Sequence, residues 1–353
     1  GFFGSLNGIL ITNPTNIRYL TGFSGVAPEE REAYVLITHD KTMLFTGSLY
    51  SEVARQITQA KRLSFVEISK EYPLSAALTD ITTQEHIVRL GFEEHNLTVS
   101  EYTKYKQVLP LVKLIPTHDR IEVLRMIKRK DEIDNIKLAA QFTDKCFTFL
   151  MHRIRPGTTE SRLAAEIEGF FRYHGAENAF RPIVAFNAHS SQPHYHTLDT
   201  APLRRGSLIL LDFGARVNGY CADMTRVIFF GAPQKEWIHT YETVLAANNK
   251  ALELLRDGQR NGATLDAAAR EVIAEAGLPV YPHSLGHAVG LDIHEAPRLT
   301  VQKEALLQPY MTVTVEPGIY IENAYGVRIE DLVLLRDNGI EVLSQSPKGL
   351  TIL

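Results

Sequence analysis

The chain has few of the features that mark a secreted, membrane-spanning or nucleic-acid-binding protein. Its 353 residues include only two cysteines, Cys146 and Cys221, which lie far apart in no CxxC pattern, so the sequence favours a reducing cytoplasm over a disulfide framework. No apolar run is long enough to cross a bilayer, and the first ten residues lack the basic start and cleavage site of a secretory signal. The formal net charge of −4 gives no reason to expect nucleic acid or an anionic membrane as a partner.

What the sequence does contain is a set of metal-binding residue types in short, glycine-containing motifs. They are Asp212 in LLDFGA, Asp223 in YCADMTR, His287 in SLGHAVGLDIHE, Glu316 in VEPGIY and Glu330 in GVRIED. Four carboxylates and one imidazole suit a pair of Mn²⁺, Co²⁺ or Zn²⁺ ions better than a single structural zinc, which usually prefers thiolates. Two metals with a shared water make a hydrolase the first function to consider.

The first third of the chain alternates between strand-like and helical patterns. Apolar, β-prone runs predict strands at 33–38, 43–46 and 89–93, and helical spacing predicts a helix over 49–60. The stretch 109–119 contains two prolines and has no clear period. We therefore expect an α/β domain over residues 1–115 and a second domain over 120–353.

The rest of the chain has helical patterns that repeat. Helices are predicted over 131–153, from the turn after Arg155 to about 174, over 237–256 and over 264–276. Residues 155–167 resemble residues 260–272, which lie 105 positions further on, and the same offset carries Asp212 and Asp223 close to Glu316 and Glu330. This pattern predicts a duplicated unit in which each half donates two carboxylates, with chance similarity between amphipathic helices as the alternative.

A β-hairpin is predicted around Asn218-Gly219, because both central residues of a type I′ turn need positive φ. In that register, paired residues have numbers that sum to 437, so Asp212 lies opposite Thr225 and Asp223 lies opposite Gly214. The two aspartates then share one face as diagonal neighbours, about 7–8 Å apart along the backbone. We expect Gly214 to leave room for a metal.

A second hairpin is predicted from the apolar runs 313–321 and 327–335. A register with numbers that sum to 646 places Glu316 opposite Glu330, although Pro317 interrupts the ladder. Two acids on one buried face would repel each other at a cost of several kcal/mol unless a cation lay between them. The same arrangement in two hairpins therefore favours a metal centre over solvated surface acids.

Some of the thirteen histidines stand out by their setting. His287 lies between two glycines, His294 follows seven residues later, and His283 precedes His287 by four. His194 lies in the polar loop SSQPHYH, where His196 is a rival for any role given to it. For each of them, the alternative to function is a hydrogen-bonded structural imidazole.

Together with Asn16–Gly25 (NIRYLTGFSG), these motifs resemble the proline-specific metallopeptidases of the pita-bread fold, namely Xaa-Pro aminopeptidase (aminopeptidase P) and Xaa-Pro dipeptidase (prolidase). The resemblance covers the chain and implies a creatinase-like N-terminal α/β domain before a pita-bread domain with a curved antiparallel sheet and two pairs of helices. It also implies short proline-containing peptides as substrates, and a homodimer. One departure is Val217, where many relatives carry an aromatic residue.

The resemblance also implies roles for individual residues. Asp212, Asp223, His287, Glu316 and Glu330 fall on metal-ligand positions for two divalent ions, most often Mn²⁺, whose bridging water attacks the scissile carbonyl. Glu316 would pass a proton to the leaving proline nitrogen, and His194 and His294 would stabilise the negative charge that develops. His283 and Arg328 match positions near the substrate, while Thr225 and Arg328 are candidates for contacts that orient the ligands.

The sequence leaves open whether the substrates are longer peptides or dipeptides only. The first third of the chain shows no insertion that would close the cleft, which favours the aminopeptidase. A dipeptidase would have to bind the terminal carboxylate, and Arg298 is a candidate for that contact. Methionine aminopeptidase would leave the first third surplus, creatinase lacks the metal ligands, and a non-catalytic binding module would typically have lost some of them.

Overall fold

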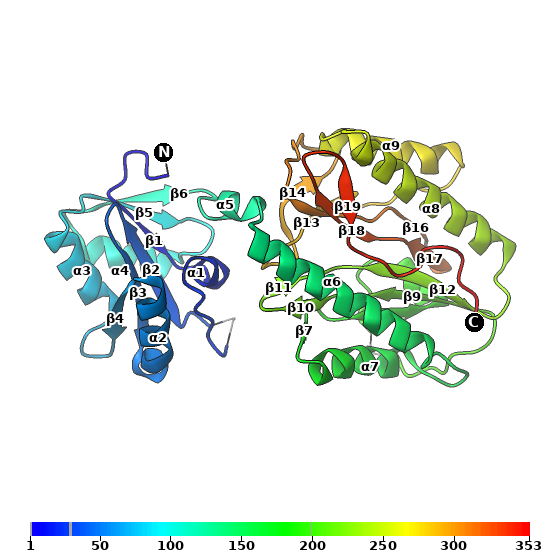
Figure 1. Ribbon diagram of the computed structural model, residues 1–353, viewed down its shortest axis with the longest axis horizontal. Coiled ribbons are helices and arrows are strands. Elements are labelled where there is room, and N and C mark those ends of the chain that lie inside the picture. The colour runs from blue at the N-terminus through cyan, green and yellow to red at the C-terminus, as the bar shows by residue number, and fades with distance from the viewer. Residues whose placement is uncertain (1, 28–29, 198) are drawn as a thin grey trace. The chain divides into compact units, whose positions relative to one another are not determined.

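Tertiary contacts divide the protein into two compact units, the first ending at Arg125 and the second beginning at Met126. The structure is a computed structural model that describes residues 2–27, 30–197 and 199–353 (Figure 1). Every helix and strand predicted from the sequence has a counterpart in these units, with bounds that differ by a few residues at most.

The first unit is built on one six-stranded sheet with the order β4-β3-β2-β1-β5-β6. The central strands β1, β2 and β3 run antiparallel, whereas β4, β5 and β6 each run parallel to their inner neighbour. The strands are β1 Gly8–Ile11, β2 Ala33–Thr38, β3 Thr42–Gly47, β4 Ser64–Ile68, β5 Arg89–Glu93 and β6 Lys113–Thr117.

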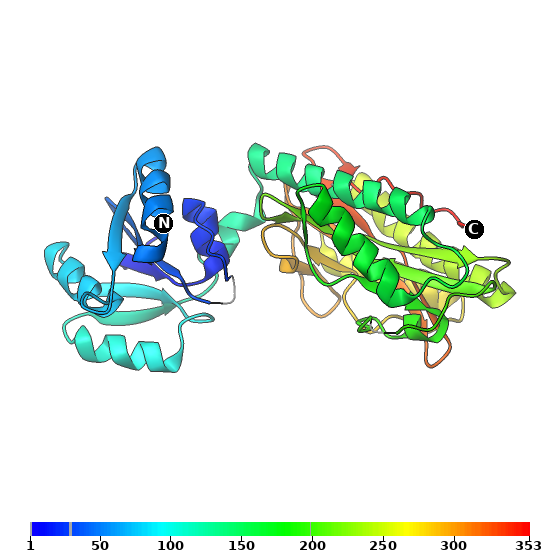
Figure 2. The same cartoon turned by 90° about the horizontal axis from the view of Figure 1, so that it is seen from below.

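Helices cover both faces of this sheet, because successive strand residues point to opposite faces and are apolar on both. Leu10 and Leu36 pack with residues of α3 and α4, whereas Ile9 and Ile11 pack with residues of α1 and α2. Figure 2 shows helices of this unit on both sides of its strands. The result is a three-layer α/β/α unit with two cores. The helices are α1 Pro14–Thr21, η1 Ser48–Tyr50, α2 Ser51–Lys61, α3 Leu74–Gln84, α4 Val99–Val108 and α5 Glu122–Met126.

The segment expected to separate the domains instead holds strand β6, so the first unit extends ten residues beyond residue 115, to Arg125. Pro116 suggested a linker because proline cannot donate a ladder hydrogen bond. Here it lies opposite Phe92 on a strand at the edge of the sheet, where proline is tolerated.

The second unit contains two pairs of helices, α6 with α7 and α8 with α9 (Figure 1). The helices are α6 Lys130–Met151, α7 Glu160–Tyr173, η2 Asn187–Ser191, α8 Lys235–Arg256 and α9 Gly262–Glu275. Helices α6 and α8 both have 22 residues and begin 105 positions apart, as the predicted duplication requires. No helix among the described residues combines the length and the hydropathy needed to cross a membrane.

The helix pairs pack on antiparallel sheets with the orders β12-β9-β8, β11-β10-β7, β14-β13-β15-β18-β19 and β16-β17. The strands of the first half are β7 Glu177–Asn178, β8 Ile183–Phe186, β9 Ser207–Asp212, β10 Ala215–Val217, β11 Tyr220–Cys221 and β12 Thr225–Phe230. Those of the second half are β13 Gly286–Ala288, β14 Glu295–Leu299, β15 Thr312–Val315, β16 Gly318–Ile321, β17 Tyr325–Arg328, β18 Asp331–Leu335 and β19 Ile340–Val342.

The alternation of side chains along these strands decides which residues face away from the helices. Phe213 contacts Phe171 of α7, so Asp212 before it points to the opposite face. In the other half, Val315 belongs to the core formed with α8, so the next residue, Glu316, also turns away from the helices. In each half, one face of the sheet builds the core and the other carries carboxylates.

Candidate metal centre

The first hairpin has the register predicted from its turn. Asp212 pairs with Thr225 in β9 and β12, and Val217 pairs with Tyr220 in β10 and β11. Asn218 and Gly219 have φ angles of 51° and 87°, as a type I′ turn requires. Because no residue is inserted between the two ladders, both aspartates lie on the same face.

The role predicted for Gly214 is wrong. A Cβ atom at this position would lie 1.8 Å from the carbonyl oxygen of Ala222, in the opposite strand of the hairpin. Glycine is therefore required by the close approach of two backbone segments beside Asp223, and not by space for an ion.

The second hairpin also has the predicted register. Val315 pairs with Asp331 and Gly318 pairs with Arg328, so Glu316 and Glu330 face each other across the interruption at Pro317. The two hairpins meet where the Glu330 N–H donates to the carbonyl of Thr225 at 3.1 Å. With the side-chain contacts of Arg226 to Glu330 and of Arg328 to Asp212, this bond holds the end of one ribbon against the other and brings both pairs of acids together.

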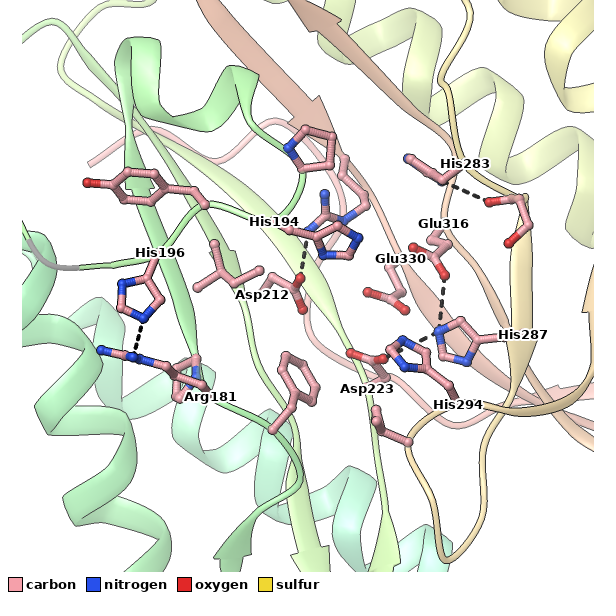
Figure 3. Close-up of a pocket in the computed structure, with 18 of the residues that line it drawn as sticks. Arg181, His194, His196, Asp212, Asp223, His283, His287, His294, Glu316 and Glu330 are labelled. Atoms are coloured by element: carbon pink, nitrogen blue, oxygen red, sulfur yellow. Dashed lines mark hydrogen bonds and ion pairs between the residues drawn. The ribbon is translucent and has the colours of Figure 1, made fainter. Parts of the chain in front are cut away.

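The five predicted ligands form one group, in which Glu316 is partly exposed and the other four are buried (Figure 3). His287 Nε2 lies 3.3 Å from Glu316 Oε1 and 3.8 Å from Asp223 Oδ2. One donor atom from each of Asp223, His287 and Glu330 lies within 4.8 Å of the others. The exposed fraction is only 2% for Glu330 and 6% for Asp223, so water solvates these carboxylates poorly.

The carboxylates of this group are incompletely satisfied. Asp212 Oδ1, Asp223 Oδ1 and Glu330 Oε1 are all buried and have no hydrogen-bond partner. Burial and the neighbouring carboxylates raise the pKa of Asp223 and of Glu330 well above the usual range. Buried acids that repel one another and offer unused lone pairs are the arrangement expected around cations, so the residues fit a divalent metal site.

Further contacts orient the ligands. His287 Nδ1 lies 3.1 Å from the carbonyl of Ala288, which leaves Nε2 facing the carboxylates. The Thr225 hydroxyl donates to Glu330 Oε2 at 2.7 Å, and the Thr314 hydroxyl donates to Glu316 Oε1 at 3.0 Å. Thr225 thus makes the kind of contact predicted for it, whereas Thr314 had no recognisable signal in the sequence.

Arg328 lines the cavity, as its predicted position near the substrate requires, and it also makes the ligand-orienting contacts that were the other role predicted for it. Its side chain is buried, and it donates to Asp212 at 2.5 Å, to the Tyr320 hydroxyl at 2.8 Å and to the Thr225 hydroxyl at 3.0 Å. Each of its three nitrogens is therefore engaged by the protein. Arg328 balances part of the negative charge and holds Asp212, which makes it a residue that positions a ligand.

A cavity of about 420 Å³ opens over the metal-ligand group. Its lining includes His194, His196, His283, His294 and Arg298, so every histidine singled out in the sequence reaches it. The ring of His294 packs edge-on against that of His287, with centroids 4.5 Å apart. Burial, together with the neighbouring His287 and Arg298, lowers the pKa of His294 to about 4, so this imidazole is neutral above that pH.

The structure distinguishes His194 from His196, the two histidines that competed for one predicted role. His196 contacts the guanidinium of Arg181 through its Nε2, whereas His194 lies beside Asp212 (Figure 3). His283 lies on another side of the cavity, where its Nε2 is 3.0 Å from the Tyr320 hydroxyl and its Nδ1 is 2.8 Å from the Ser284 carbonyl. Burial lowers the pKa of His283.

The hydrogen bonds that Glu160 makes to the loop carrying His194 were not predicted from the sequence. The carboxylate of Glu160, at the start of α7, accepts from the Phe186 N–H at 2.5 Å, from His189 at 2.8 Å and from the Tyr195 hydroxyl at 2.9 Å. The ring of Tyr195 also stacks on His189 with centroids 4.6 Å apart. Tyr195 directly follows His194, so these contacts fix the backbone from which His194 projects.

A carboxylate-rich candidate metal site in a cavity, carried by a duplicated pita-bread unit that follows an α/β unit in the sequence, is the arrangement of a metal-dependent hydrolase. The pattern of metallopeptidase family M24 matches residues 134–337, and the creatinase/prolidase N-terminal domain matches residues 4–127. The chain therefore belongs to metallopeptidase family M24, with a creatinase-type N-terminal domain, as the sequence motifs predicted.

Relatives cover both units of the chain. The Xaa-Pro dipeptidase of Pyrococcus furiosus is 35% identical over 348 residues, which cover 98% of this chain and 95% of that protein. The structure of an Xaa-Pro dipeptidase from Bacillus anthracis matches with a TM-score of 0.91 and 36% identity, covering 99% of this chain and 95% of the other. The structure of an X-Pro aminopeptidase from Thermotoga maritima matches with a TM-score of 0.89 and 32% identity, covering 99% and 98%.

Proposed function

We propose that the protein hydrolyses the bond before proline at the N-terminus of short peptides. The observation that carries this proposal is one cavity whose lining joins the metal-ligand group to apolar side chains against which a proline ring can pack. Phe180, Pro182, Ile183 and Pro193 contribute to its lining. Relatives named for Xaa-Pro peptide bonds support the same substrate class.

The metal ligands in this proposal are Asp212, Asp223, His287, Glu316 and Glu330. A pair of divalent ions, for which we propose Mn²⁺ with Co²⁺ or Zn²⁺ as alternatives, supplies Lewis acidity and lowers the pKa of a bound water. Oxygen-rich donors favour Mn²⁺ among these ions.

The chain's own residues then handle protons and charge. Burial alone would raise the pKa of Glu316, but its hydrogen bond and charge attraction to His287 lower it to about 2. Glu316 is therefore an ionised carboxylate that can take a proton from the attacking water and deliver it to the proline nitrogen. His194 and His294 are placed at the cavity to donate hydrogen bonds to the carbonyl oxygen as it becomes negative.

Proline explains why a specialised site is needed. The bond before proline is a tertiary amide without an N–H, so a peptidase that recognises that hydrogen cannot bind it in the usual way. A site that seats the ring against apolar side chains and holds the carbonyl beside the metals does not need the missing donor.

For peptide length we propose a dipeptidase, which reverses the preference drawn from the sequence. Arg298 on β14 lines the cavity and pairs with the ligand His287 in the sheet register. Its exposed guanidinium is suited to the carboxylate that a dipeptide carries immediately after the scissile bond. The aminopeptidase remains the second candidate, supported by the close match to the Thermotoga maritima structure.

Three substrates separate these functions: an Xaa-Pro dipeptide, its C-terminal amide and an Xaa-Pro-Xaa tripeptide. A dipeptidase should prefer the free dipeptide, and Arg298→Ala should raise KM for it by about 10-fold or more while leaving the amide unchanged, because only the carboxylate is bound by arginine. Steady-state kinetics on metal-loaded protein measure both effects. Equal or faster cleavage of the tripeptide would establish the aminopeptidase, and no cleavage of any of the three by fully loaded protein would reject the proposal.

Tyr195→Phe should lower kcat about 10-fold with little change in metal content. The substitution removes only the hydroxyl that donates to Glu160 at 2.9 Å, so the loop carrying His194 loses one of its fixed points. Tyr173→Phe is the matched control, because Tyr173 is 86% exposed on α7. A Tyr195→Phe enzyme with unchanged kcat would show that the Glu160 contact does not position His194.

A further inference from the structure

Four residues of the first unit come together where two strands end. Glu94 and His95 follow β5 directly, and His118 and Asp119 follow β6 directly. Because β5 and β6 are parallel neighbours, their carboxyl ends lie side by side at the same end of the strands. The Glu94 N–H donates to the carbonyl of Thr117 at 3.3 Å, which joins the two segments just before the cluster.

Three of these side chains converge with the geometry of a metal site. His118 Nδ1 lies 2.8 Å from Glu94 Oε1 and 3.1 Å from His95 Nε2, and the last two atoms are 4.0 Å apart. Three atoms at these separations lie on a circle of about 2.0 Å radius, so one point is equally distant from all three. Zinc binds imidazole nitrogen at about 2.0–2.1 Å and carboxylate oxygen at about 2.0–2.2 Å.

A second contact prepares His118 for this role. Its other ring nitrogen, Nε2, lies 2.9 Å from Asp119 Oδ2. A carboxylate that accepts the N–H of a metal-binding imidazole is the usual supporting contact in zinc sites, because it fixes the tautomer and directs the free lone pair at the ion. Here that lone pair is directed at Glu94 and His95, two further groups that donate lone pairs.

We propose that Glu94, His95 and His118 bind one divalent transition-metal ion of the Zn²⁺, Ni²⁺ or Cu²⁺ type, with Asp119 supporting His118. Two imidazoles and one carboxylate select softer ions than the carboxylate-rich centre of the second unit does. All three ligands are exposed, so the ion exchanges with solvent and water completes its coordination. Bound metal links the segments after β5 and β6 and stabilises the first unit by mass action. This site is independent of the proposed peptidase function.

Zinc titration of the full-length, metal-free protein tests the site by counting equivalents with calorimetry and a competing chromophoric indicator. The wild type should bind one more equivalent of Zn²⁺ than His118→Ala or His95→Ala, and Asp119→Asn should weaken that equivalent about 10-fold. His39→Ala is the matched control, since His39 is an exposed histidine of the same unit outside the cluster, and it should keep wild-type stoichiometry.

Equal stoichiometry in the wild type and His118→Ala would overturn the proposal and leave the cluster as a set of hydrogen-bonded surface side chains. The second unit provides a separate check. Asp223→Asn should lose catalytic metal yet retain the equivalent that depends on His118. Anomalous scattering from zinc-soaked crystals should show a peak between His95 and His118, and its absence at full occupancy of the catalytic centre would also count against the site.

Discussion

Asp223→Ala should abolish metal loading and peptidase activity together. Asp223 is buried, its Oδ1 has no hydrogen-bond partner, and its Oδ2 lies 3.8 Å from His287 Nε2, so alanine removes two carboxylate oxygens from the centre of the proposed ligand group. Without the cations a water molecule keeps its ordinary pKa near 15.7, and kcat/KM should fall by about 10⁴-fold or more. Metal analysis and dipeptide hydrolysis on the same preparation measure the two losses.

Glu322→Gln is the matched control, because Glu322 is an exposed carboxylate in the turn of the hairpin that carries Glu316 and Glu330. It should retain both metal and activity. A metal-depleted Asp223→Ala protein that still cleaves Xaa-Pro bonds would disprove the assignment. Asp223→Asn repeats the experiment with a side chain of nearly the same shape, which separates loss of the ligand from loss of packing.

The pH dependence of stability provides a measurement that does not depend on activity. Burial and like charges raise the pKa of Asp223 and Glu330 in the folded protein, so the native state binds more protons than the unfolded state. Unfolding of metal-free protein in urea should therefore require less denaturant as pH rises above the usual carboxyl range. The lowered pKa of Glu316 changes the free energy of unfolding in the opposite direction, but that change occurs only between its ordinary pKa and about pH 2. Asp223→Asn should make the urea midpoint decrease less steeply with rising pH. In saturating metal the midpoint should instead increase with pH.

His294→Ala should reduce kcat by about 10²–10³-fold while both metals stay bound. The ring of His294 packs edge-on against His287 and lines the cavity, and His294 is not one of the five residues proposed as ligands. Its pKa of about 4 leaves a neutral imidazole at neutral pH, which can donate a hydrogen bond without placing another cation beside the metals. Single-turnover kinetics with parallel metal analysis measure the effect.

His239→Ala serves as the comparison, since His239 is an exposed histidine on α8 in the same unit. It should leave turnover and metal content unchanged. If His294→Ala instead lost metal, His294 would have to be reassigned as a ligand, and if turnover were unchanged, the stabilisation of the carbonyl oxygen would rest on His194 alone.

The sequence predicted the ligand group well because hairpin register is a local property. An Asn-Gly turn fixes which residues face each other, and the structure pairs Asp212 with Thr225 as that turn requires. The second register was harder to predict, since Pro317 breaks the ladder, yet the pairs on both sides of the break agree with it. The internal duplication of the second unit could also be predicted, because both halves contain the same local helix and strand patterns.

Other predictions failed where the reason was not local. The prolines of 109–119 suggested a boundary, and only the sheet order shows that β6 is an edge strand that tolerates Pro116. Glycine at position 214 was attributed to space for a metal. The close approach of the Ala222 backbone, which actually requires glycine, is visible only in the structure. The sequence left two roles open for Arg328, and only the packing shows that it contacts Asp212, Thr225 and Tyr320 while still lining the cavity. The reducing compartment, the homodimer and the choice of Mn²⁺ stay predictions.

The sequence by itself determined the family, the two-part organisation, the five candidate metal ligands and the face of each ribbon on which the acids lie, because short motifs and turn chemistry act within a few residues. Tertiary structure alone decided how those faces meet, through a hydrogen bond such as that from Glu330 to Thr225, which joins residues 105 positions apart. It also decided which of the adjacent histidines His194 and His196 is engaged by Arg181, and which carboxylate, Glu160, holds their loop. Contacts between distant segments depend on packing of the whole chain, and no spacing along the sequence encodes them.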